Sequence, residues 1–118
     1  MNMLTGKKQG KNYSMNHDKA LKLLGLALRA GKLVHGDEAV EKAVKRDKVA
    51  CIILAKDISQ ATYSRYQRLS QVHHVPCINN FTRDELSHAL NKSRSILGIT
   101  DRGMSAKFLS YQTGEERI

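Results

Sequence analysis

The sequence predicts a layered α/β domain in which helices cover both faces of a β-sheet. Its 118 residues suffice for one domain, and 41% of them are hydrophobic while only 5% are aromatic. A core of Leu, Ile, Val and Ala is typical of layered α/β domains rather than of β-sandwiches. Strand patterns alternate with helix patterns, and the run at residues 49–55 is apolar throughout. We expect that run to be a strand buried on both faces.

The domain is expected to follow a basic tail. Residues 1–16 are polar and lack a periodic pattern, so they cannot bury enough apolar surface to offset their loss of conformational entropy. We therefore expect residues 1–16 to be disordered, residues 17–112 to form one folded domain, and residues 113–118 to form a C-terminal tail.

Two helices and a short strand are predicted in the first half of the domain. Leucines recur at helical spacing from residue 17 onward, and Gly31 is a typical stop signal, which predicts a helix over residues 17–31. A short strand follows at residues 33–34. The next helix is expected over residues 37–47, and its apolar side is formed by Val40, Ala43 and Val44.

The alternation of strands and helices continues after the buried strand. A helix capped by Asp57 or Ser59 is expected to run to about residue 73. Its expected inward face consists of Ile58, Thr62, Tyr66, Leu69 and Val72.

The last third of the chain adds two strands and two helices. Strands are expected at residues 75–78 and 95–100, and a helix at residues 82–90, where Thr82 and Glu85 form a capping box. A final helix starts at residue 101 or 102. This order predicts right-handed βαβ units and helices on both faces of the sheet.

The charge balance indicates a polyanionic partner. Lys and Arg outnumber Asp and Glu by 20 to 11, which gives a formal net charge of +9. Such a field attracts RNA, DNA or an anionic membrane surface. The longest apolar stretch is far shorter than the roughly 20 residues that a membrane-spanning helix requires. We expect a cytoplasmic protein that does not enter the membrane.

Sequence patterns typical of catalysis, metal binding or nucleotide binding are not found. The chain has neither a glycine-rich phosphate-binding loop nor a nucleophile signature. His73 and His74 are adjacent, so on a helix their side chains diverge by about 100°. Cys51 and Cys77 lie in apolar runs and are expected to be reduced core residues. We predict no enzymatic activity, no cofactor and no metal.

The stretch "GKLVHGDEAVEKAV", residues 31–44, is the most informative one. Gly36 allows the backbone to turn sharply and to approach a ligand closely. Asp37 and Glu38 then open a helix, where acids stabilise the positive end of the helix dipole. The same carboxylates can accept hydrogen bonds from base edges, while backbone N–H groups and lysines hold phosphates.

Several separated motifs resemble a known family. The segments "LLGLALRAGKLVHGDEAVEKAV", "VACIILAKDIS", "HHVPCI" and "LSHALNKSRSILGITD" are similar, in this order, to the bacterial YlxQ-type branch of the kink-turn RNA-binding ribosomal protein superfamily, the L-seven-Ae and L-thirty-e class. The resemblance covers about residues 18 to 110. It implies a three-layer α/β/α sandwich around a four-stranded mixed sheet.

The resemblance also implies where RNA binds, namely the start of the second helix and the loop before the last strand. By position, Gly36 matches the family glycine and Lys42 the phosphate-contacting lysine. Members that bind kink-turns tightly have Thr, Asn and Glu where this chain has Asp37, Glu38 and Ala39. The second loop, residues 91–95, is shorter and basic where the tight binders carry an apolar loop.

These observations lead to one hypothesis and two alternatives. The hypothesis is a non-catalytic, ribosome-associated monomer that recognises structured, kink-turn-like RNA. Its expected RNA contacts are Gly36, Asp37, Glu38 and Lys42 on one side and Lys92, Ser93 and Arg94 on the other, with Lys32 and Arg65 as further phosphate contacts. The alternatives are a protein–protein interaction module of the translation machinery and a substrate-binding domain of an RNA-modifying enzyme.

Overall fold

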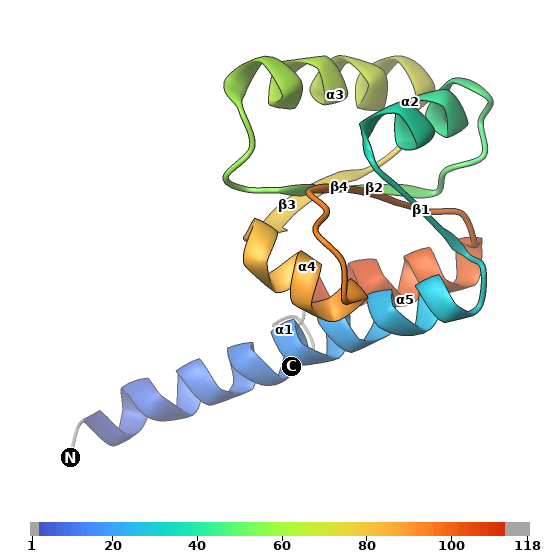
Figure 1. Ribbon diagram of the computed structural model, residues 1–118. Helices are drawn as coiled ribbons and strands as arrows, with labels where there is room; N and C mark the ends of the chain where they lie inside the picture. The colour runs from blue at the N-terminus through green and yellow to red at the C-terminus, as the bar shows by residue number, and fades with distance from the viewer. Residues whose placement is uncertain (1–2, 113–118) are drawn as a thin grey trace.

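The computed structural model describes the backbone of residues 3–112 and the side chains of residues 16–112. The expected C-terminal tail, residues 113–118, lies outside the described residues. Helices and strands alternate in the described part (Figure 1). They are α1 (Met3–Arg29), β1 (Leu33–His35), α2 (Asp37–Lys45), β2 (Cys51–Ala55), α3 (Gln60–His73), β3 (Cys77–Phe81), α4 (Arg83–Leu90), β4 (Ile96–Ile99) and α5 (Arg102–Gln112).

The four strands form one mixed sheet in the order β1-β4-β2-β3. Strand β4 is antiparallel to both β1 and β2, and β3 is parallel to β2. The mixed sheet implied by the resemblance is therefore confirmed. The expected βαβ arrangement is present twice, because β1, α2 and β2 form one parallel unit across the intervening β4 and β2, α3 and β3 form a second between adjacent strands, whereas β4 runs antiparallel to its neighbours. The alternation of elements does not determine where β4 inserts, and it inserts between β1 and β2.

Helices cover both faces of the sheet, as predicted. In Figure 1, α2 and α3 lie on one face, while α1, α4 and α5 lie on the other. All five residues of β2 are buried, and they point alternately into two separate cores. Ile52 and Leu54 pack with Val40, Val44 and Tyr66 under α2 and α3. The other core lies under α1, α4 and α5 and contains Cys51, Ile53, Ala55, Leu24, Leu86 and Phe108.

Helix α1 begins earlier than expected. It spans 27 residues from Met3, so residues 3–16, which we expected to be disordered, are helical. No proline interrupts this segment, and once packing has nucleated a helix, each further residue adds one backbone hydrogen bond. The N-terminal part of α1 extends beyond the other elements (Figure 1). Neither α1 nor any other described helix has the apolar length that a membrane crossing requires.

The predicted caps agree with the structure, whereas some boundaries do not. Ser59 caps α3 by accepting a hydrogen bond from the Thr62 N–H, and Thr82 and Glu85 form the expected capping box. Helix α2 ends at Lys45 rather than at residue 47.

Two predictions about α3 and β3 were wrong in detail. The Val72 side chain is 63% exposed, although we placed it on the inward face of α3. It lies at the margin of the helical stripe centred on Tyr66, which is fully buried. Strand β3 begins two residues later than expected, because Pro76 has no N–H to donate. The Pro76 carbonyl instead accepts a hydrogen bond from the Ile52 N–H, at 2.8 Å, just before the strand starts.

Candidate nucleic-acid interface

The start of α2 and the loop before β4 lie side by side. The Gly36 N–H donates a hydrogen bond to the Ile96 carbonyl at 2.9 Å. A Cβ atom placed on Gly36 would lie 4.0 Å from Nε of Arg94. We call this region, residues 35–38 and the exposed Lys42 with residues 91–96, the site edge. The structure thus brings together the two segments in which the resemblance implies RNA contacts.

Gly36 has a backbone conformation that other residues rarely adopt. Its φ is 95° and its ψ is 147°, a region essentially restricted to glycine. Gly36 is also the N-cap of α2, and no side chain caps the first turn. The positive end of the helix dipole and its free N–H groups therefore lie at the site edge, where they favour an anion.

The acids at the start of α2 bind a cation of α3. Asp37 accepts hydrogen bonds from the Arg65 guanidinium at 3.0 and 2.6 Å and from the Tyr66 hydroxyl at 2.7 Å. Glu41 accepts a further hydrogen bond from Arg65 at 2.5 Å. The Arg65 hydrogen bond holds the pKa of Asp37 below its usual value, with a smaller contribution from Tyr66. These contacts tie α2 to α3.

Asp37 and Arg65 therefore contact each other in the protein. We expected Asp37 to reach a base edge and Arg65 to reach a phosphate, and direct RNA contacts by these two residues stay predictions. What the structure shows is a link between helices. The Tyr66 hydroxyl adds a hydrogen bond to the Asp37 backbone carbonyl at 2.9 Å, and burial raises the pKa of Tyr66.

The outer side of α2 carries two charged side chains that are available to bind a ligand. Glu38 and Lys42 are exposed, one helical turn apart, and neither has an ion-pair partner within the described part of the chain. Lys45 lies farther along the helix and pairs with Glu41 at 3.0 Å. Glu38 and Lys42 are thus the predicted α2 side chains that point to solvent at the site edge.

The second predicted segment is held in place by α4. Asn91 ends α4 in the left-handed conformation, with a φ of 60°, and turns the chain into the loop. The Arg94 N–H donates to the Ser87 hydroxyl at 3.0 Å, and that hydroxyl donates to the Arg94 carbonyl at 3.2 Å. The Ser93 hydroxyl accepts a hydrogen bond from Arg83 at 2.8 Å. Lys92 is exposed.

A histidine that we did not predict completes the site edge. His35, the last residue of β1, accepts a hydrogen bond at Nδ1 from Nε of Arg94 at 2.8 Å. Burial lowers the pKa of His35, and the charges of Arg94 and Lys92 lower it further. Its position directly before Gly36 is a weak sequence signal, because nothing in the local pattern indicates that Arg94, 59 residues later, lies against it.

Lys32 lies away from the site edge. Its carbonyl accepts a hydrogen bond from the Thr100 N–H at 2.9 Å, so it sits at the opposite end of β1 from Gly36. The two positions are four residue steps apart along this extended segment, which corresponds to about 13 Å. The Lys32 ammonium lies 4.0 Å from the Asp101 carboxylate, at the start of α5. The structure does not bring this predicted RNA contact together with the others.

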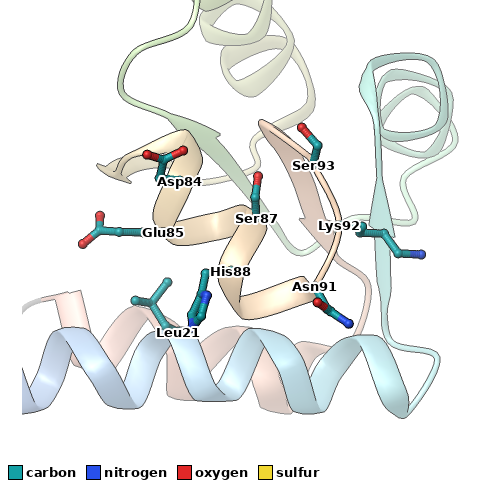
Figure 2. A pocket seen from close by; sticks show the side chains of 8 residues that line it. All are labelled: Leu21, Asp84, Glu85, Ser87, His88, Asn91, Lys92 and Ser93. Carbon is teal, nitrogen blue, oxygen red and sulfur yellow. The ribbon is translucent and has the colours of Figure 1, made fainter.

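A hollow of about 670 Å³ lies next to the loop, between α1 and α4 (Figure 2). Its polar side chains diverge: the Ser87 and Ser93 hydroxyls are hydrogen-bonded to Arg94 and Arg83, whereas Lys92 points away from the hollow, as Figure 2 shows. The lining residues are Leu21, Asp84, Glu85, Ser87, His88, Asn91, Lys92 and Ser93. No group of three His, Cys, Asp or Glu side chains within the described residues is placed to hold a metal ion.

Known proteins resemble this chain over most of its length. The profile of the ribosomal protein L7Ae/L30e/S12e/Gadd45 family matches residues 18–109. A protein of Enterococcus faecium described as RNA-binding protein YlxQ is 35% identical over 92 residues, which cover 78% of this chain and 89% of the relative. A Bacillus subtilis protein with the same description is 30% identical over 89 residues, 75% of this chain and 89% of the relative.

Solved structures show the same fold. A protein of unknown function from Bacillus halodurans superposes with a TM-score of 0.76 and 34% identity, over 79% of this chain and 95% of that chain. The Giardia lamblia 15.5kD RNA binding protein superposes with a TM-score of 0.70 over 90% of both chains. At 18% identity, this second likeness concerns the fold alone.

Proposed function

This chain belongs to the ribosomal protein L7Ae/L30e/S12e/Gadd45 family and is YlxQ-like within it, and from this premise we propose that it binds structured RNA without catalysing a reaction. The observation that carries the proposal is the meeting of the α2 N-terminus and the basic loop at one sheet edge. The names of the two YlxQ relatives support RNA as the partner.

Each part of the site edge has a role in this proposal. The free N–H groups at the start of α2 and the cations Lys42, Lys92 and Arg94 hold phosphates. Gly36 has no side chain, so the RNA can approach the backbone closely. The Glu38 carboxylate accepts hydrogen bonds from base N–H groups, as such groups do in nucleic-acid recognition.

The ion pairs of Arg65 with α2 hold the site edge in a fixed orientation. Arg65 binds two acids of α2, one helical turn apart, at 2.6 and 2.5 Å. This arrangement fixes the rotation of α2 about its own axis relative to α3, and so fixes the direction in which Glu38 and Lys42 point. In our proposal Asp37 and Arg65 preorganise the surface, which reduces the ordering that RNA binding would otherwise require.

The target is proposed to be ribosomal or other structured RNA, bound by a cytoplasmic monomer. A kink-turn exposes base edges that call for an amide and a carboxylate at consecutive positions. Ala39 provides no polar group, so we expect only a modest preference for a kink-turn over a plain hairpin.

Salt dependence of RNA binding tests this function. Affinities of the whole chain for a kink-turn RNA and for a hairpin of equal length are measured between low and physiological salt. Each phosphate contact contributes about −0.7 to −0.9 to the slope of log affinity against log salt. Three cations at the site edge predict a slope of roughly −2 to −3. A slope near zero, or no binding to either RNA, would contradict the proposal.

A further inference from the structure

We propose that His35 is a positioning residue that holds the Arg94 guanidinium beside the start of α2, and that full RNA affinity requires the neutral form of its ring. This proposal rests on RNA binding at the site edge, as put forward above. It concerns a contact between β1 and the loop before β4 that neither the family likeness nor the sequence pattern indicates.

The geometry immobilises Arg94 at two points. Its backbone is held by the Ser87 hydroxyl, which both accepts from the N–H and donates to the carbonyl. Its side chain is held by His35, whose Nδ1 accepts the Nε–H at 2.8 Å. Only an unprotonated ring nitrogen can accept a hydrogen bond, so this contact requires a neutral His35 with its proton on Nε2.

A guanidinium held in this way keeps most of its donors. Of its five N–H groups, one donates to His35 and one to the Ser93 carbonyl, at 2.8 Å each. The other three have no partner within the described part of the chain. The guanidinium itself lies near Gly36, since a Cβ there would be 4.0 Å from Nε of Arg94. A planar fork with free donors matches a phosphate or a guanine edge.

The surrounding charges favour the neutral ring. Burial is the largest influence that lowers the pKa of His35, followed by the cations Arg94 and Lys92. The Asp37 carboxylate, which could oppose them, is engaged by Arg65. Arg94 and Lys92 in the loop are the charges that act on the ring, the acids Asp37 and Glu38 follow at the start of α2, and β4 carries no charged residue. Protonation would remove the acceptor and set a second cation against Arg94.

Two substitutions of His35 separate positioning from folding. His35→Ala removes the acceptor, whereas His35→Asn keeps a side-chain oxygen near the place of Nδ1 and does not titrate. At pH 7.5 we expect His35→Ala to raise the Kd for a kink-turn RNA about three- to tenfold and His35→Asn to change it less than about twofold. In an Arg94→Ala background, His35→Ala should add no further loss, because both changes then remove the same contact.

The pH dependence of RNA affinity distinguishes a positioning role of His35 from a purely structural one. The ratio of wild-type to His35→Asn affinity should be constant above the usual histidine pKa of 6.5 and should fall at lower pH. Titration of the RNA itself affects both proteins and cancels in this ratio. A higher wild-type affinity at low pH would mean that the ring acts as an extra cation, which would overturn the proposal.

The remaining outcomes are also decisive. Unchanged affinity of a folded His35→Ala variant, or additive losses in the double variant, would overturn the positioning role. Either result combined with a steep salt dependence of wild-type binding would leave the proposed function standing. Absence of wild-type RNA binding would overturn both proposals.

Discussion

Asp37 shows how strongly the role of one side chain depends on a distant partner. An acid at the start of a helix stabilises the dipole, and it can also accept hydrogen bonds from a base. In the structure its carboxylate binds Arg65 and Tyr66, which lie 28 and 29 residues later in the chain. Acids therefore gather at the start of α2 in a basic protein partly because they link two helices.

The first prediction at this scale concerns stability and pH. Asp37→Asn removes the charged acceptor, so we expect the free energy of unfolding at pH 7 to fall by about 0.5–1.5 kcal/mol, since Asp37 is half exposed. The pKa of Asp37 lies below its ordinary value of 3.8, so its stabilisation is present above that value and is lost as the pH falls through the lowered pKa.

Urea unfolding of both proteins from pH 7 to pH 2.5 checks this prediction. The difference between wild type and Asp37→Asn should disappear at the acid end. Glu38→Gln is the matched control, because Glu38 is exposed and has no ion pair within the described residues. An equal effect of both substitutions would show that Asp37 stabilises the protein through the helix dipole rather than through Arg65.

The second prediction concerns specificity at the neighbouring positions. Glu38→Asn with Ala39→Glu supplies the amide and the carboxylate that tight kink-turn binders carry. If about 1.4 kcal/mol is recovered, the preference for a kink-turn over a hairpin should rise roughly tenfold. One acid remains in the first turn, so helix stability should barely change. An unchanged preference in a folded protein would mean that this turn does not face the RNA bases.

At the scale of elements, Gly36 sets the direction in which α2 leaves the sheet. Gly36→Ala would not clash, since the nearest heavy atom to a new Cβ is 4.0 Å away. Its cost comes from a φ of 95° and should be about 1–3 kcal/mol of stability. Gly31→Asn is the control, because asparagine tolerates the left-handed φ of 72° there. Similar melting temperatures of the two variants would argue against strain at Gly36.

Helix α1 gives the second prediction at this scale. Among the described residues, its fully or nearly fully buried side chains begin at Ala20. Deleting residues 1–14 should therefore leave the melting temperature nearly unchanged, although the helix starts at Met3. RNA affinity should fall at low salt, because the deletion removes Lys7, Lys8 and Lys11. A large fall in melting temperature would show that the N-terminal part of α1 contributes to the folded domain.

The sequence predicts elements better than it predicts their contacts. The capping box and the buried strand β2 follow from local patterns, and both are confirmed. A periodic pattern of apolar residues does not reveal which distant element packs against it. For this reason Val72 was placed inward, and the contact between His35 and Arg94 was not foreseen.

At the scale of the whole molecule, the insertion of β4 creates the site edge. β4 pairs with both β1 and β2, and this brings the loop at residues 91–95 against Gly36. The resemblance implied this meeting, whereas the composition and the order of elements did not. The same topology places Lys32 beside Thr100 at the far end of β1, and a one-dimensional pattern contains no sign of that separation.

In our proposal RNA contacts the site edge rather than the basic surface in general. Lys42 and Lys92 are exposed at this edge, whereas Lys32 and Lys107 are exposed elsewhere, at the far end of β1 and on α5. Two double variants, Lys42→Ala with Lys92→Ala and Lys32→Ala with Lys107→Ala, have the same net charge.

Their affinities for one structured RNA, measured across a range of salt concentrations, show whether RNA binds at the site edge. The variant at the site edge should bind more weakly and should lose about two units of salt slope, since each lysine accounts for about one phosphate contact. The variant with the distant substitutions should keep the wild-type slope. Equal losses in both variants would contradict this proposal, because binding would then depend on net charge and not on this edge.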